Sequence, residues 1–501
     1  MGVTGKIFSR RWVLGGLLSG IALPGAATVR PKARPGKLPQ ARETLATTSA
    51  PTQAAEALIA GARLGGQVGY LVVDAASGRV LESLGADVPL PPASVAKTLT
   101  TAYALETLGG DYRFSTRLIG TGPVTGGILQ GDLVLVGGGD PTLSTDDLGD
   151  MAAALKAGGV HAVAGRFLVA SGALPHVEAI DPSQPDQVDY NPGISGLNLN
   201  FNRVYFGWAK QGAGWALTMD ARADRFNAPV REAQMAIVDR EGPQYTYARQ
   251  DGVESWTVAA RALGKGGSRW LPVRAPGPYA GDVFQELAAA QGIVLAEPQM
   301  LDGTVVGSVL AEHRSGDLRA ILREMLKYST NVTAEIVGLT ASVKRGGPVD
   351  SLATSAARMA DWARDRFGIS VTFYDHSGLG SQNRVTAADL VKLLRAATSD
   401  DLRGILKTIP LRDAKGNWVK NSPVQVQAKS GTLNFVSNLA GYETTAKGHE
   451  LVFAILSGDV ARCEAVPRED REAPYGVRSW IARAHALQQA LLQRWAAVYD
   501  A

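Results

Sequence analysis

Ser94 and Lys97 lie three residues apart at the start of a predicted helix, and their types suit a nucleophile and its base. Residues 91–110 predict the helix because two prolines precede it, apolar residues recur at helical spacing from Val95 to Leu105, and a glycine pair ends it. A serine hydroxyl needs a base to take its proton, and a lysine amine is such a base when burial or a second cation lowers its pKa. Residues three apart share a helix face, so the amine can reach the hydroxyl. The alternative is a capping serine beside a solvated lysine.

Two later motifs favour the catalytic interpretation. The sequence YSTN places Ser329 and Asn331 at the end of a predicted helix, and AKSGT places Lys429 at the end of a predicted strand. In this order the elements resemble the motifs Ser-x-x-Lys, Ser-x-Asn and Lys-Ser/Thr-Gly of penicillin-recognising enzymes. The resemblance implies that Ser329 relays a proton to the leaving amine and that Asn331 binds a substrate amide. Lys429 would be a second cation that lowers the pKa of Lys97.

Each later motif has a rival in the sequence. His376–Gly378 has the pattern of the third motif, and Ser381–Asn383 has the pattern of the second. Both lie in residues 374–386, which predict a loop punctuated by glycines, and no predicted strand leads into it. We therefore expect His376 to be structural and Lys429 to be the cation.

The spacing of the motifs indicates a particular family. Residues 98–328, which separate the first motif from the second, contain many short β-like segments, whereas a class A β-lactamase keeps these two motifs much closer. The chain thus resembles the class C low-molecular-mass penicillin-binding proteins, which are D-alanyl-D-alanine carboxypeptidases and endopeptidases. Three further segments carry the resemblance: GDLVLVGGGDPTL at 131–143, DHSGLG at 375–380 and KSGTLNFVSNLAGY at 429–442.

This resemblance implies a fold and a mechanism. The fold class is α/β (α+β), a penicillin-binding/β-lactamase-like transpeptidase domain with an antiparallel sheet covered by helices, and a β-rich domain inserted into it. Ser94 would attack the carbonyl between two D-alanines with Lys97 as base, and Ser329 with Lys429 would protonate the leaving group. The backbone N–H groups of Ser94 and Thr432 would form the oxyanion hole. The substrate-binding residues would be Ser430, Gly431 and Thr432, with peptidoglycan stem peptides as substrates and β-lactam antibiotics as covalent inhibitors.

The domain organisation follows from changes of pattern along the chain. We expect an export signal at 1–27, a flexible linker at 28–55, a serine peptidase domain at 56–118 and 312–501, and a β-rich insertion at 119–311 that consists of one or two subdomains. The paired arginines Arg10 and Arg11 favour a twin-arginine signal; an ordinary secretory signal or an uncleaved anchor is the alternative. A protein with this signal would work in the periplasm.

Composition limits the other functions. The 501 residues are 45% hydrophobic and 20% charged, which is typical of a globular protein. The net charge is +4, but residues 1–42 carry eight basic residues and no acidic one, so the remainder has a net charge of −4 and does not favour nucleic acid. The basic residues of 28–42 could associate with a membrane surface. One cysteine and six scattered histidines predict no disulfide and no metal site, and no cofactor is expected.

Two alternatives remain at this point. One is a β-lactamase-like hydrolase, which would need a well-placed water for fast deacylation. The other is a non-catalytic periplasmic scaffold that binds peptidoglycan with the same fold, although a scaffold has no need of the pair Ser94 and Lys97. The preference between carboxypeptidase and endopeptidase is also left open by the motifs.

Overall fold

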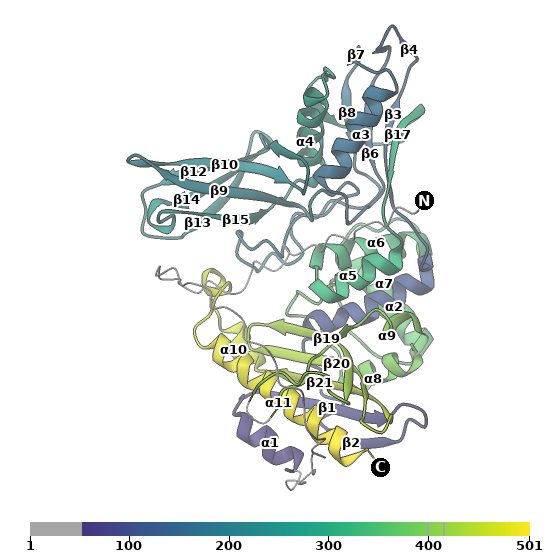
Figure 1. Cartoon of the computed structure of the whole chain (residues 1–501), viewed down its shortest axis with the longest axis vertical. Helices are drawn as coiled ribbons and strands as arrows, with labels where there is room; N and C mark the ends of the chain where they lie inside the picture. Colours follow the sequence, from purple (N-terminus) through teal and green to yellow (C-terminus); the bar gives the residue numbers. More distant parts are fainter. Residues whose placement is uncertain (1–52, 398–399, 414–415, 501) are drawn as a thin grey trace, which may run out of the picture. The chain divides into compact units, whose positions relative to one another are not determined.

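The sheet that carries the third motif has six antiparallel strands in the order β18-β19-β20-β21-β1-β2 (Figure 1). The computed structural model describes residues 53–397, 400–413 and 416–500; the predicted signal and nearly all of the predicted linker lie outside them. β20 and β21 are almost continuously buried because helices cover both faces of the sheet. The strands are β1 (Gln67–Asp74), β2 (Val80–Leu84), β18 (Lys407–Thr408), β19 (Gln425–Leu433), β20 (Val436–Thr444) and β21 (Glu450–Gly458).

The helices form two layers on this sheet. The long helix α11 (Val477–Val498) and α1 (Ala55–Ala62) cover one face, where Trp480 and Trp495 are fully buried. A larger core lies on the other face, under helices from both parts of the predicted peptidase domain. These helices are α2 (Lys97–Leu108), α5 (Leu318–Tyr328), α6 (Asn331–Gly346), α7 (Leu352–Phe367), α8 (Ala387–Ala396) and α9 (Asp400–Arg403). Short helices are α10 (Val460–Glu464) and the 3-10 turns η1 (Ala93–Ala96), η2 (Ala260–Ala262) and η3 (Arg468–Asp470).

The residues between α2 and α5 form four further sheets and two helices. In the described part of the chain, none of their strands joins the six-stranded sheet. A five-stranded sheet has the order β16-β8-β6-β3-β17, with β3 (Ser115–Gly120), β6 (Leu133–Gly137), β8 (Phe167–Ala170), β16 (Pro298–Met300) and β17 (Ser308–Arg314). A four-stranded sheet contains β9 (Arg203–Gln211), β10 (Gly214–Arg222), β11 (Asn227–Pro229) and β15 (Gly266–Pro272). Two three-stranded sheets contain β12 (Ala233–Val238), β13 (Tyr245–Gln250) and β14 (Val253–Ala259), and β4 (Val124–Thr125), β5 (Ile128–Leu129) and β7 (Ala162–Val163). The helices are α3 (Thr145–Ala157) and α4 (Pro276–Ala290).

The first and last strands of this region pair with each other. β3 and β17 are antiparallel neighbours, and Ser115 lies opposite Arg314. The chain therefore leaves the peptidase helices and returns to them at adjacent points. The expected boundaries at 118/119 and 311/312 fall inside these two strands, because the strand pattern runs across both positions without a break.

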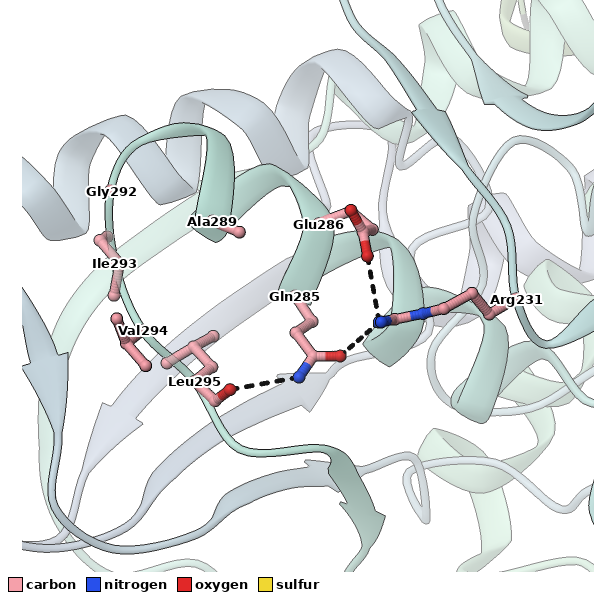
Figure 2. A pocket seen from close by; sticks show the side chains of 8 residues that line it. All are labelled: Arg231, Gln285, Glu286, Ala289, Gly292, Ile293, Val294 and Leu295. Atoms are coloured by element: carbon pink, nitrogen blue, oxygen red, sulfur yellow. Dashed lines mark hydrogen bonds and ion pairs between the residues drawn. The ribbon is translucent and has the colours of Figure 1, made fainter.

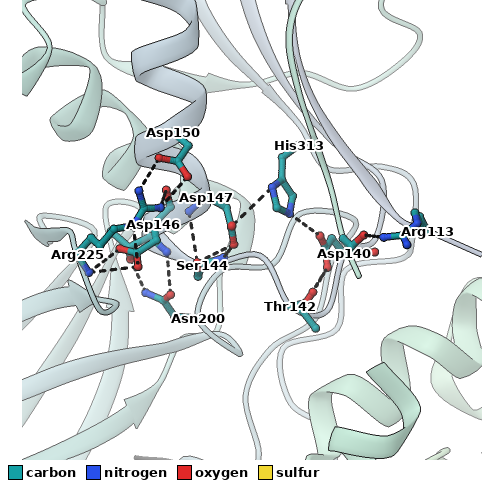
Figure 3. Close-up of polar contacts among 12 residues, drawn as sticks. Arg113, Asp140, Thr142, Ser144, Asp146, Asp147, Asp150, Asn200, Arg225 and His313 are labelled. Carbon is teal, nitrogen blue, oxygen red and sulfur yellow. Dashed lines mark hydrogen bonds and ion pairs between the residues drawn. The ribbon is translucent and has the colours of Figure 1, made fainter. Parts of the chain in front are cut away.

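A charged cluster fixes the end of β17 (Figure 3). The imidazole of His313 lies between Asp140 and Asp147, with nitrogen–oxygen distances of 3.5 and 3.6 Å. The carboxyl groups raise the pKa of His313, led by its hydrogen bond with Asp140. Asp147 also completes a capping box with Ser144 at the start of α3, so the cluster ties the returning strand to this helix. Among the described helices, none is both long enough and apolar enough to cross a membrane.

Candidate active site

Ser94 lies in the 3-10 turn η1, immediately before α2, and not in the first turn of the α-helix itself. The residue before it, Ala93, has a left-handed φ of 48°. Two contacts hold this strained backbone. The side-chain amide of Asn438 donates to the carbonyls of Pro91 and Pro92 at 2.8 Å each. Gly378 packs so closely on Ala93 that a side chain at position 378 would collide with the carbonyl of Ala93. The nucleophile therefore stands on a fixed turn, and its side chain is half-buried.

The amine of Lys97 is fully buried and lies against three oxygens. Its Nζ is 2.9 Å from Ser94 Oγ, 2.8 Å from Asn331 Oδ1 and 2.8 Å from the carbonyl oxygen of Ser377. Burial lowers the pKa of Lys97, and the nearby carboxyl groups of Glu335 and Asp375 oppose that shift. The structure thus brings the first two predicted motifs together around one amine.

Ser329 and Asn331 lie at the junction of two helices. Ser329 ends α5 with a left-handed φ of 60°, and Asn331 is the first residue of α6. This sharp change of direction aims both side chains at the amines: Ser329 Oγ accepts a hydrogen bond from Lys429 Nζ at 3.0 Å. The nitrogen of the same Asn331 amide points the other way: Nδ2 donates to the carbonyl of Tyr190 at 2.9 Å.

Lys429 is also buried, on β19, and its Nζ donates to its neighbour's carbonyl, Ser430 O, at 2.5 Å. Its pKa is lowered well below the usual value by burial first, then by Lys97 and Lys407. Burial is the first cause of the lowered pKa of Lys97, and Lys97 and Lys429 repel each other when both are charged.

Gly431 brings β19 against the turn that carries the nucleophile. A Cβ at this position would lie 2.8 Å from Pro92 O and 2.9 Å from the backbone nitrogens of Ser94 and Val95, which is closer than side chains tolerate. Thr432 follows, exposed, at the same edge. β18 pairs with β19 at Gln427 and Ala428, and in the described residues the edge from Ser430 onward has no strand beside it on that side. This edge can accept an extended peptide.

The floor of the site contains residues that the motif analysis missed. Glu335 accepts hydrogen bonds from the backbone N–H groups of His376 and Ser377, both at 2.8 Å. Asp375 accepts from Gly378 N at 2.6 Å and from Gly380 N at 2.7 Å. One signal was available: Glu335 follows Asn331 by four residues on the same helix, which puts both on one face. No sequence signal could identify the carbonyl of Ser377, because every residue has a backbone carbonyl.

The side chains of His376 and Asn383, from the two rival motifs, point away from Ser94 and Lys97. The ring of His376 is fully buried, with Nε2 2.7 Å from Ser355 Oγ of α7, and burial lowers its pKa to about 3. Asn383 is bound to Asp375 at 2.8 Å and accepts from Tyr374 N at 2.7 Å, so it braces its own loop. Neither side chain makes one of the hydrogen bonds of Ser94 or Lys97 given above.

Other sites on the described part of the chain lack this chemistry. No group of three or more His, Cys, Asp or Glu side chains there could hold a metal ion. A pocket of about 300 Å³ lies in the inserted region beside the end of α4 (Figure 2). Its polar side chains are already paired, because Arg231 donates to Gln285 at 2.5 Å and lies 3.2 Å from Glu286.

The six-stranded sheet and the three motifs around Ser94 define a penicillin-binding serine peptidase. The chain belongs to the D-Ala-D-Ala carboxypeptidase 3 (S13) family, whose sequence profile matches residues 52–478. A D-alanyl-D-alanine carboxypeptidase of Actinomadura sp. (strain R39) is 28% identical over 434 residues, which cover 78% of this chain and 77% of the relative. A carboxypeptidase of Mycobacterium tuberculosis is 28% identical over 463 residues, covering 89% and 88%. The crystal structure of penicillin binding protein 4 from Haemophilus influenzae has the same fold, with a TM-score of 0.69 and 20% identity, covering 89% of this chain and 99% of that one. The predicted fold class and the predicted enzyme class are confirmed.

Proposed function

We propose that this enzyme cleaves D-alanyl-D-alanine bonds in peptidoglycan stem peptides, as a carboxypeptidase or endopeptidase, through an acyl-enzyme on Ser94. The observation that carries this proposal is the set of acceptors around Lys97. Asn331 Oδ1 and the Ser377 carbonyl can only accept hydrogen bonds, and each lies 2.8 Å from Nζ. A neutral amine has two hydrogens to give, so these two acceptors take both. Its lone pair is then left for the hydroxyl of Ser94, 2.9 Å away, which is the arrangement of a general base.

The reaction would run in two steps. Ser94 Oγ attacks the carbonyl carbon between the two D-alanines while its proton passes to Lys97, and the resulting oxyanion accepts hydrogen bonds from the N–H groups of Ser94 and Thr432. The carbon–nitrogen bond then breaks, and the leaving amine takes a proton through Ser329 and Lys429, whose side chains are 3.0 Å apart. Water hydrolyses the ester, which releases the shortened peptide and restores Ser94.

Substrate would bind as an added strand at the free edge of β19. Ser430, Gly431 and Thr432 line that edge, and Thr432, which is exposed, would hold the terminal carboxylate of a carboxypeptidase substrate. A β-lactam presents a reactive amide and a carboxylate in a similar arrangement, so it would acylate Ser94 and remain attached. This chemistry needs no cofactor or metal.

The substrate implies a location outside the cytoplasm. We place the enzyme in the periplasm, with residues 1–27 as its export signal and the paired arginines Arg10 and Arg11 as a twin-arginine element. Residues 28–42 carry five basic residues and no acidic one, which supports contact with an anionic membrane surface.

The test is covalent labelling of the mature protein by penicillin, followed by intact mass. One drug equivalent is expected on the wild type, none on Ser94→Ala, and one on Ser381→Ala, whose serine belongs to the rival motif. Release of D-alanine from a pentapeptide separates the peptidase from a scaffold, and slow turnover of the bound drug separates it from a β-lactamase. Labelling of a folded Ser94→Ala protein would overturn the assignment.

A further inference from the structure

The turn Asp375–Gly380 gives its backbone N–H groups to two buried carboxyl groups. Glu335 of α6 takes the N–H groups of His376 and Ser377, and Asp375 takes those of Gly378 and Gly380, at distances from 2.6 to 2.8 Å. Glu335 and Asp375 are 0% and 2% exposed. Burying two carboxyl groups side by side is costly, and a turn alone does not need both.

The position of this turn matters because it carries an acceptor for Lys97. The carbonyl of Ser377 lies 2.8 Å from Nζ, and the N–H of the same peptide unit, on Gly378, donates to Asp375. The residue that bears the carbonyl donates its own N–H to Glu335 Oε1. The peptide unit whose carbonyl receives the lysine hydrogen is therefore held by Asp375, and the peptide unit before it is held by Glu335.

We propose that Glu335 is a positioning residue for the amine of Lys97: its carboxyl group fixes the turn that presents the Ser377 carbonyl to that amine. This inference rests on the proposed role of Lys97 as base. The titratable groups near Lys97 are Glu335 from α6, Asp375 from the turn and Lys429 from β19. The ring of His376 points instead to Ser355 of α7.

Position, and not charge, is the means by which Glu335 would act on the amine of Lys97. Burial first, and then the nearby carboxyl group of Asp375, raise the pKa of Glu335 to about 8. The carboxyl group is therefore largely protonated near neutral pH, where its oxygens still accept the hydrogen bonds from the turn.

The test compares the second-order rate of acylation by penicillin across pH in three variants. Glu335→Gln keeps the shape of the side chain but removes one acceptor. We expect its acid limb to stay near that of the wild type, because Glu335 is largely protonated in that pH range. Its plateau should fall by about tenfold or more, because displacing a reacting group by about 1 Å can cost 10²-fold.

Glu335→Asp tests position by itself. It keeps the carboxyl group and retracts it from the turn, so the plateau should again be low and the acid limb should stay near that of the wild type. Glu443→Gln is the matched control, since Glu443 is another fully buried glutamate, placed on β20, and should give the wild-type profile. A melting curve for each variant checks that it folds.

Two outcomes would overturn the inference. The first is a folded Glu335→Gln protein with the wild-type pH profile and rate. The second is that neither Glu335 variant folds while Glu443→Gln does, which would give Glu335 a purely structural role. Labelling of Ser94→Ala would remove the proposed function itself, so the two failures are distinguishable.

Discussion

Gly431→Ala tests the closest backbone approach in the site. A methyl group there would lie 2.8 Å from Pro92 O and 2.9 Å from the nitrogens of Ser94 and Val95. These are backbone atoms, and Asn438 holds the same turn through two hydrogen bonds of 2.8 Å. The turn therefore cannot move aside as the end of a flexible side chain would, and β19 must shift away from it.

The expected loss follows from what the methyl displaces. The nitrogen of Ser94 is one of the two proposed oxyanion donors, and losing one such donor costs about 10²–10³ in rate, or about 2.7–4 kcal/mol. We expect the second-order rate of penicillin acylation, measured by stopped flow, to fall by that factor. Forcing an extra methyl into a packed site also costs about 1–3 kcal/mol of stability, which a melting curve measures.

A matched control is available in the same chain. Gly214 in β10 has open space around the position of a Cβ, so Gly214→Ala should acylate at the wild-type rate. A folded Gly431→Ala protein that acylated within about threefold of the wild type would refute the reasoning, because the strand edge and the N–H of Ser94 would then not bind the reacting carbonyl as proposed.

The remaining predictions concern other buried groups. Lys429→Ala should lower the acylation rate by about 10²-fold or more, and high pH should not rescue it, because burial already lowers the pKa of Lys97. His376→Ala should leave the acylation rate nearly unchanged and cost about 1–3 kcal/mol of stability. The reverse ranking of these two rates would move the third motif to His376. Burial raises the pKa of Glu443 from its ordinary 4.5 to about 9. Between these pH values the folded protein keeps a proton that the unfolded chain releases, so the stability of the folded protein falls as pH rises through this range. Glu443→Gln should therefore raise the melting temperature more at pH 9 than at pH 5; an equal shift at both would show that Glu443 does not titrate there.

The catalytic motifs were predictable because their geometry is local. Ser94 and Lys97 are three residues apart, and that spacing places the amine near the hydroxyl in the 3-10 turn as well as in an α-helix. The alternation before Lys429 identified β19 for the same reason. Their convergence rested on the family resemblance, because Ser329 and Lys429 meet only through tertiary packing.

The floor of the site was not predictable for a physical reason. Its acceptor for Lys97 is a backbone carbonyl, of Ser377, which leaves no trace in the residue type. The sequence also left two causes open for the low pKa of Lys97, burial and a second cation, and burial is the first cause. Burial of an amine depends on helices α2 and α6 packing together, and composition does not reveal that contact.

The inserted region also contributes to the site through its backbone. The carbonyl of Tyr190, which lies in that region, accepts a hydrogen bond from Asn331 Nδ2, so the oxygen of this amide must face the amine of Lys97. The segment that carries Tyr190 is held in turn by Glu472, which accepts from Gln187 and from Arg269 at 2.7 Å each. If the amide of Asn331 were flipped, its NH₂ group would face Lys97 Nζ, and Nζ would lose an acceptor for one of its hydrogen bonds. The inserted region thus sets the orientation of Asn331, a residue of the Ser-x-Asn motif in the peptidase domain. The long insertion between the first two motifs therefore takes part in building the site.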